Sequence, residues 1–353
     1  MEIRIKKAES LKSKPDENNL GFGQNFTDHM FIMDYEKDKG WHDPRIVPYG
    51  PIEVPPSMST FHYGQAVFEG MKAYKGPDGK ILLFRPEKNM ERLNESNKRM
   101  CIPEIDTDFC LKSIKELVNL DREWVPGAEG TSLYIRPFII ATDPTLRLKP
   151  STSYKFIVIL SPVGAYYPQG IDPVDIYVEN KYVRAVKGGT GFAKTSGNYA
   201  ASMKAQANAA EKGFVQVLWL DGFERKYVQE VGSMNVFFKI AGEVITPKLD
   251  GSILPGITRD SVIELVRSWG IPVKETQITI GEVYQSYSEG KLEEAFGTGT
   301  AAVISPVGSL HWEGKEIKIN DGKTGELSAK IYDNITGIQT GRLEDPFEWI
   351  DEI

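Results

Sequence analysis

The chain has 353 residues, of which 41% are hydrophobic, and it carries a formal net charge of −7. This length suits about two domains with sizeable cores. Acidic and basic residues are interspersed, which disfavours nucleic acid and anionic membranes as partners, because both need clustered positive charge. The sequence has no apolar run of the roughly 18 residues that cross a bilayer, and no secretory signal at its start. We therefore expect a cytoplasmic protein.

The cysteines and histidines indicate neither a disulfide scaffold nor a metal site. Cys101 and Cys110 are too few and too far apart for a CxxC motif, so two ordinary thiols are expected. The four histidines are scattered and do not show the spacing of metal ligands. The sequence thus predicts no metal.

The N-terminal half mixes predicted strands and helices. Residues 1–35 are expected to form a strand followed by a loop, and the aromatic and β-branched content of residues 59–75 predicts strand. An Asp-Gly turn at 75–80 leads into a further strand. Helices are predicted at 86–100, which begins with proline, and at 106–125, where apolar residues recur on one face. Two more strands follow, TSLYIRPFIIATD and YKFIVILSPVG.

The segment 161–173 holds three prolines and two glycines between apolar runs, which is typical of an interdomain connection. The remainder is rich in predicted strands, including KLDGSILPG at 248–256, with helices at 196–212 and 256–269. These elements predict an α+β protein. The expected division is a small N-terminal α/β domain at 1–162, an interdomain loop at 163–173 and a large C-terminal domain at 174–353.

One lysine stands in unusual surroundings. The stretch GGTGFAKTSGNYAAS, residues 188–202, surrounds Lys194 with glycines and small polar residues and leads into an alanine-rich helix. A solvated lysine is the commoner state. A desolvated lysine has a lowered pKa and acts as a Schiff-base amine towards an aldehyde. The stretch alone leaves both interpretations open.

A pyridoxal phosphate site needs, besides that amine, an acid for the ring nitrogen and a hydrogen-bond partner for the ring hydroxyl. Glu230 interrupts an apolar strand and is a candidate acid, although an outward-facing strand position would also explain it. Tyr199 follows Lys194 by five residues and is a candidate partner for the hydroxyl, or a core aromatic.

The cofactor's phosphate also has candidate ligands. Pro-Gly precedes a predicted helix whose first amides belong to Ile257 and Thr258, and such a helix start binds anions. The turn GTGTAA, residues 297–302, could form a nest of amides, and Arg92 would supply a cation. Neither glycine turn is specific on its own.

Taken together, these residues resemble the branched-chain amino acid aminotransferases, which are class IV aminotransferases of the fold-type IV pyridoxal phosphate enzymes. The matching segments occur in chain order and span most of the sequence: FTDHM, HYGQAVFEGMKAY, LFRPEKNMERL, LYIRPFI, VGAYYPQG, GGTGFAKTSGNYAAS, QEVGSMNVFF, ILPGITRDSV and FGTGTAAVISPV. The resemblance implies a pseudo-barrel in the larger domain, pyridoxal 5'-phosphate as cofactor and a homodimer whose subunits complete each other's sites.

The resemblance also implies a role for each candidate. Lys194 would be the Schiff-base and proton-transfer residue. The cofactor would be held by Arg92, Tyr199, Glu230, Ser233, Ile257, Thr258 and Thr300. The substrate would be held by Phe22, Tyr63, Phe68, Tyr134, Arg136, Tyr166, Thr300 and Ala301. In this set Arg136 would meet the γ-carboxylate of glutamate or 2-oxoglutarate.

The implied reaction is ping-pong transamination of leucine, isoleucine and valine with 2-oxoglutarate. A D-amino acid aminotransferase or an aminodeoxychorismate lyase would share the residue types at Lys194, Glu230 and Arg92. A non-catalytic protein that binds a phosphorylated metabolite would explain the two glycine turns. It would leave Lys194, Tyr199 and Glu230 without a joint role.

Overall fold

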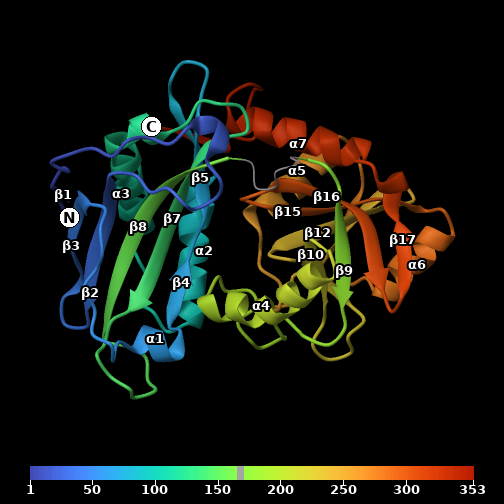
Figure 1. The fold of residues 1–353 in the computed structure, drawn as a ribbon, viewed down its shortest axis with the longest axis horizontal. Helices are drawn as coiled ribbons and strands as arrows, with labels where there is room; N and C mark the ends of the chain where they lie inside the picture. Colours follow the sequence, from blue (N-terminus) through green and yellow to red (C-terminus); the bar gives the residue numbers. More distant parts are fainter. Residues whose placement is uncertain (165–170) are drawn as a thin grey trace. The chain divides into compact units, whose positions relative to one another are not determined.

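The computed structural model describes residues 1–164 and 171–353. The chain forms two compact units, each with its own sheet and helices, so the α+β class is confirmed (Figure 1). The first unit contains Met1–Tyr166, Ala193–Ser196 and Gly337–Ile353, and the second contains Tyr167–Phe192 and Gly197–Thr336. Residues 193–196 and 337–353, which fall within the expected C-terminal range, belong to the first unit.

The first unit is built on a nine-stranded sheet. Among the described residues its order is β1-β3-β2-β8-β7-β5-β6-β18, with β4 paired to β7. All these pairings are antiparallel except that of β1 with β3. The strands are β1 Arg4–Ile5, β2 His29–Glu36, β3 Gly40–Pro48, β4 Ala66–Phe68, β5 Met71–Lys75, β6 Ile81–Phe84, β7 Ser132–Ala141, β8 Ser153–Val163 and β18 Ile350–Glu352.

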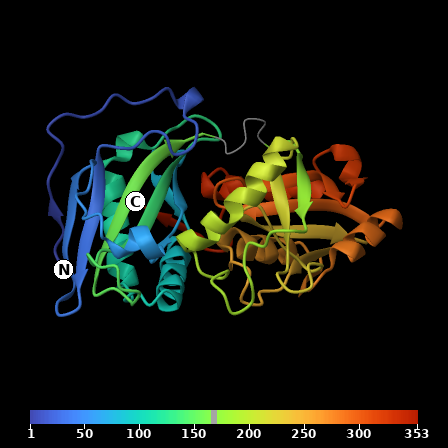
Figure 2. The same ribbon diagram turned by 60° about the horizontal axis from the view of Figure 1, so that its bottom comes forward.

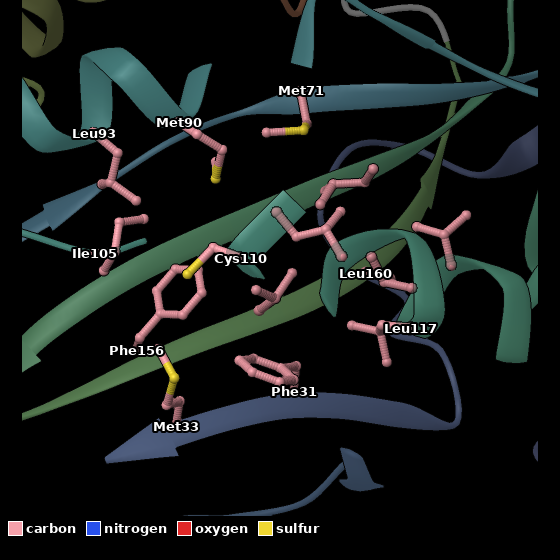
Figure 3. Packing of buried hydrophobic residues seen from close by; sticks show 14 of the residues in the cluster. Phe31, Met33, Met71, Met90, Leu93, Ile105, Cys110, Leu117, Phe156 and Leu160 are labelled. Carbon is pink, nitrogen blue, oxygen red and sulfur yellow. The ribbon is translucent and has the colours of Figure 1, made fainter. Parts of the chain in front are cut away.

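Two helices of the first unit, α2 (Pro86–Arg99) and α3 (Thr107–Leu120), contact each other and the sheet. Met90, Leu93, Cys110 and Leu117 on these helices belong to the same buried cluster as Phe31, Met33 and Phe156 on the strands (Figure 3). Both helices were predicted from their apolar spacing, which this packing explains. Asp106 caps α3 by accepting a hydrogen bond from the Phe109 amide. The chain then continues as the 3₁₀ turn η2, Arg122–Trp124.

The second unit contains a closed barrel. Its strands follow the order β11-β10-β9-β16-β15-β12-β13-β14, and β11 also pairs with β12, which closes a ring of six strands. The pseudo-barrel implied by the resemblance is therefore present. The strands are β9 Val174–Glu179, β10 Gln216–Leu220, β11 Val228–Val231, β12 Met234–Ile240, β13 Glu243–Pro247, β14 Val273–Thr276, β15 Leu292–Gly299, β16 Val303–Trp312 and β17 Lys315–Lys318.

Helices lie outside this barrel (Figure 2). They are α4 Ser196–Glu211, α5 Ile257–Ser268, α6 Ile280–Ser288 and α7 Glu326–Gln339, with the 3₁₀ turn η3 at Ile319–Gly322. The predicted helices at 196–212 and 256–269 are confirmed within a residue or so at each end. Among the described residues, no helix combines the length and the apolar character that a membrane span requires.

Three predicted elements are wrong. Residues 59–63 form the short helix α1 (Ser59–Tyr63) instead of a strand, because Gly64 adopts a left-handed conformation that ends a helical turn. The strand β2 begins inside the predicted loop of residues 1–35; most of its side chains are buried, so it does not show alternation. Residues 248–256 are irregular, since side chains rather than a neighbouring strand bind the backbone there.

Candidate active site

The backbone around Lys194 is fixed by the first unit. The Lys194 amide donates to Ser96 Oγ on α2 at 2.9 Å, and its carbonyl accepts from the Phe68 amide at 3.0 Å. The neighbouring Thr195 donates through Oγ1 to the Ala66 carbonyl at 2.7 Å. This lysine therefore belongs to a segment whose backbone is held between α2 and β4.

An aromatic ring lies between the Lys194 side chain and a guanidinium. The Phe68 ring centroid is 5.3 Å from Lys194 Nζ and 4.9 Å from Arg136 Cζ. Arg136 Nη2 also donates to the Tyr134 hydroxyl at 3.1 Å, and Phe22 packs edge-on against the Tyr134 ring. The first unit thus brings together five of the predicted residues as an amine, an apolar wall and a cation.

Arg92 is held by a carboxylate that the sequence reasoning missed. Arg92 Nε and Nη2 each donate to a different oxygen of Glu69 at 2.8 Å, and Asn89 donates to the same carboxylate. Glu69 is fully buried. Burial alone would raise the pKa of Glu69, but the positive charge and hydrogen bonds of Arg92, with the charge of Lys194 and the Asn89 bond, lower it. Glu69 therefore stays ionised and orients Arg92.

Two further predicted substrate residues stand apart from this group. Tyr63 on α1 is exposed, and its hydroxyl donates to the Leu146 carbonyl at 2.5 Å. Tyr166 lies outside the described residues, as do the other residues of the expected interdomain loop between 165 and 170. The structure therefore does not place either residue beside Lys194.

The second unit holds Glu230 in a buried position on β11. Its Oε1 accepts from the Leu254 amide at 2.8 Å, and its Oε2 lies 3.1 Å from Arg184 Nε. Only 3% of Glu230 is exposed, so the outward-facing interpretation is excluded. Arg184 was missed by the sequence reasoning, because its own segment gives no sign that it pairs with an acid 46 positions later.

The predicted phosphate ligands also lie in the second unit. Helix α5 begins at Ile257 after Gly256, and no side chain caps its first turn. A Cβ at Gly256 would collide with Asn235 Oδ1, so only glycine fits at this helix start. Thr300 and Ala301 form the turn between β15 and β16. The remaining two predicted residues are Ser233, in the turn between β11 and β12, and Tyr199, in the first turns of α4.

The candidates therefore form two groups. The first unit carries Phe22, Tyr63, Phe68, Arg92, Tyr134, Arg136 and Lys194, and the second carries Tyr199, Glu230, Ser233, Ile257, Thr258, Thr300 and Ala301. Within the described part of the chain, no three His, Cys, Asp or Glu side chains gather as a metal site would require.

Comparison with known proteins relates the chain to one class of enzyme. A family model described as amino-transferase class IV matches residues 66–310. The chain is 62% identical over 351 residues to branched-chain-amino-acid aminotransferase 2 of Bacillus subtilis (strain 168), which covers 99% of this chain and 97% of that protein.

Solved structures give the same relation. Branched-chain amino acid aminotransferase of Escherichia coli is similar with a TM-score of 0.76 and 28% identity, covering 92% of this chain and 98% of that one. Branched-chain aminotransferase of the thermophilic archaeon Thermoproteus uzoniensis, solved with norvaline, has a TM-score of 0.76 and 27% identity and covers 92% and 99%. The chain therefore belongs to the class IV aminotransferases and, within them, to the branched-chain aminotransferases.

Proposed function

We propose that this protein transfers the amino group of L-leucine, L-isoleucine or L-valine to 2-oxoglutarate in a ping-pong cycle, with pyridoxal 5'-phosphate as cofactor. The observation that supports this most is the Phe68 ring, which contacts both the Lys194 amine and the Arg136 guanidinium. The first unit thereby combines an amine for the chemistry, an apolar wall for a branched side chain and a cation for a second carboxylate.

The residues fit this cofactor chemically. A buried carboxylate such as Glu230 suits a protonated ring nitrogen, and the start of α5, which no side chain caps, suits a phosphate. We assign Glu230 to the ring nitrogen, Tyr199 to the ring hydroxyl, and the phosphate to Arg92, Thr300 and the amides of Ile257 and Thr258. Ser233 is a further cofactor-binding residue in this proposal. When bound, the cofactor supplies a ring that accepts the electron pair left on the substrate's α-carbon.

Lys194 moves the protons. Its Nζ accepts the α-proton of the amino acid in the first half-reaction and returns a proton to the α-carbon of the 2-oxo acid in the second. The Lys194 amide donates to Ser96 Oγ and its carbonyl accepts from the Phe68 amide, so the backbone is fixed and the side chain swings from a constant point. The positive charge of Lys194 is one of the causes that lower the pKa of Glu69, and Lys194 Nζ lies 5.3 Å from the centroid of the Phe68 ring.

One pocket has to accept both a branched alkyl group and a carboxylate. Phe22, Phe68 and Tyr134 provide apolar surface. Arg136 lies at the edge of these rings, and its buried Nε has no hydrogen-bond partner among the described residues. We assign this guanidinium to the γ-carboxylate of 2-oxoglutarate and glutamate. Because a methylene changes selectivity by only about 1–3 kcal/mol, the three branched substrates are expected to react at comparable rates.

The proposed assembly is a homodimer. An apolar patch on the first unit, which we call the α1 patch, consists of Phe61, Tyr63, Leu146 and Leu148, with exposed fractions of 60%, 42%, 63% and 83%. Tyr63 and Leu146 adjoin, because the Tyr63 hydroxyl donates to the Leu146 carbonyl, and a group of exposed apolar residues of this kind is typical of an interface. We propose that a second copy covers this patch, so that Tyr63 reaches the partner's site and, with the amides of Thr300 and Ala301, binds the substrate's α-carboxylate.

The visible spectrum of the purified protein tests the function. We expect a yellow protein whose colour is lost on addition of L-leucine and returns with 2-oxoglutarate. Lys194→Ala should abolish this cycle, and Lys204→Ala, an exposed lysine on α4, should leave it intact. Bleaching by D-alanine but not by L-leucine would favour the D-amino acid aminotransferase. A colourless protein that takes up no cofactor would contradict the proposal altogether.

A further inference from the structure

The second unit contains a cavity that none of the residues assigned above lines. Its volume is about 420 Å³, and we call it the Gln229 cavity. Buried Val228, Gln229 and Ile253 form its base, and Val186 and Phe223 stand at its mouth with 45% and 95% of their surface exposed. A volume of this size accommodates a small organic molecule.

Phe223 is exposed on a rigid loop. The two carboxylate oxygens of Asp221 accept backbone hydrogen bonds from Phe223, Glu224, Lys226 and Tyr227 at 2.7–3.0 Å. Burial alone would raise the pKa of Asp221, but these bonds lower it, so the carboxylate stays ionised and holds the loop. An aromatic ring that a fixed loop presents to solvent beside a cavity is a preformed apolar contact for a ligand.

Gln229 offers a hydrogen-bond acceptor at the base. Its Nε2 donates to Ser252 Oγ at 2.7 Å, and only 4% of the residue is exposed. Its Oε1 is buried and has no hydrogen-bond partner among the described residues. An unpaired buried acceptor costs about 1–3 kcal/mol, and because Oε1 is closed to solvent, a donor in the cavity gains this contact only when the Gln229 amide turns towards it.

Two lysines stand at the mouth of the cavity, which three acidic residues also line. Lys187 and Lys248 both line it and are exposed, and neither side chain forms a hydrogen bond or ion pair with another described residue. The acids that line the same cavity have partners of their own. Asp221 holds its loop, Asp250 accepts from Ser252 through its amide and hydroxyl, and Glu224 pairs with Lys226.

We propose that the Gln229 cavity is a second small-molecule site that takes an aromatic carboxylate with an N–H donor on its ring. The ring would contact Phe223 and Val186, the N–H would donate to Gln229 Oε1, and the carboxylate would lie between Lys187 and Lys248. Each of these three contacts would pair a group of the ligand with a group of the cavity that has no such partner among the described residues.

The cavity is linked to Glu230 through the backbone. Gln229 and Glu230 are neighbours on β11, and both are bonded to the segment 252–254, Gln229 through Ser252 Oγ and Glu230 through the Leu254 amide. Arg184, which pairs with Glu230, also donates to the Ser252 carbonyl. A ligand that moves Gln229 therefore also acts on the segment that holds Glu230, and a change in the spectrum of the bound cofactor is expected.

Calorimetry on the cofactor-loaded enzyme tests the site with indole-3-acetate as the probe. We expect binding that L-leucine at saturation does not displace. Phe223→Ser and Lys248→Gln, both on the surface, should weaken binding at least tenfold, and the matched control Lys204→Gln should not. Methylation of the indole nitrogen and replacement of the carboxylate by an amide should each weaken binding by a similar factor, because each removes one contact.

Three outcomes would overturn the proposal. The first is the absence of heat and of a spectral change with millimolar indole-3-acetate. The second is unchanged binding in both Phe223→Ser and Lys248→Gln. The third is displacement of the probe by L-leucine, which would place it in the substrate pocket. Binding is measured without turnover, so failure of the transaminase proposal would leave this test intact.

Discussion

Glu69 and Lys72, which lie on either side of Gly70 in the sequence, are both buried, and their surroundings affect their charges differently. Glu69 is surrounded by Arg92, Asn89 and the charge of Lys194, and its pKa is lowered. Lys72 on β5 is buried opposite Tyr134 in the sheet register, and burial lowers its pKa to about 8. The surroundings of Glu69 therefore stabilise its charged form, whereas burial destabilises the charged form of Lys72.

Glu69→Gln should therefore be costly. It leaves the Arg92 guanidinium buried without its counter-charge, and loss of one partner of a buried pair reduces the free energy of unfolding by about 3–5 kcal/mol. Urea denaturation would measure this loss, and cofactor titration should show weaker binding as Arg92 loses its orientation. Glu95→Gln, which breaks an exposed pair with Lys98, is the control and should cost less than about 1 kcal/mol. Equal losses in both variants would contradict the assigned role of Glu69.

Lys72 makes stability depend on pH in a defined window. Because its pKa is about 8 when folded and near 10.5 when unfolded, the unfolded chain binds more protons between these values. Stability should be lowest below pH 8 and rise towards pH 10.5, by at most about 3 kcal/mol from this residue. Lys72→Met should flatten the difference in unfolding free energy between pH 7.5 and 10.5. An unchanged pH dependence in this variant would show that Lys72 is not the group responsible.

At the scale of single elements, the start of α5 is shaped by a residue of strand β12 and by the loop that precedes the helix. Asn235 on β12 donates through Nδ2 to the Leu254 carbonyl, and its Oδ1 occupies the space where a Cβ of Gly256 would lie. The glycine is needed here for close approach and not for an unusual dihedral, since its φ is −69°. The first amides of the helix can then face an anion.

Gly256→Ala should push Asn235 away from Leu254 and disturb this helix start. The expected loss is about 1–3 kcal/mol of unfolding free energy, with weaker binding of pyridoxal 5'-phosphate. Gly281→Ala in the first turn of α6 brings the new methyl into only an ordinary contact, 3.9 Å from Thr279 Oγ1, and should be neutral or stabilising by up to about 1 kcal/mol. Thermal unfolding and cofactor titration of the two variants separate a local effect from a general effect of removing glycine. Unaltered cofactor affinity in Gly256→Ala would remove α5 from the phosphate site.

At the scale of the whole molecule, the α1 patch makes the assembly testable. If the proposed dimer forms through this patch, Leu148→Asp should convert it to a monomer in light scattering, because the substitution places a charge in the proposed apolar contact. Phe223→Ser, which changes an exposed aromatic residue of the other unit, should leave the mass unchanged. A dimer that survives Leu148→Asp would mean that the α1 patch does not form the interface.

The proposed sharing of Tyr63 between subunits gives a second test. Tyr63→Ala and Lys194→Ala should each lower activity strongly as homodimers. Subunit exchange between them should restore activity to about a quarter of the wild-type value, because half of the dimers are mixed and each has one intact site. Absence of any recovery, with exchange shown by a tag, would place Tyr63 in the site of its own subunit.

The sequence predicted α2 and α3 well because each buries one face against a sheet, and the apolar spacing records that burial. It failed at β2, where burial of most side chains removes alternation. It also failed at 248–256, where Arg184, Glu230 and Asn235 bind the backbone from distant positions. Such bonds join residues far apart in the chain, so no local pattern reports them.

The sequence by itself determined the α+β class and the family, because the motif residues occur in a fixed order along the chain. It also singled out Lys194, Glu230 and Arg92 as candidate site residues, and their roles stay predictions. Only the tertiary structure decided that residues 193–196 and 337–353 belong with the first unit, and that Glu69 and Arg184 pair with Arg92 and Glu230. The physical reason is that the charge state and orientation of a buried group depend on neighbours that folding, not the order of residues, brings to it.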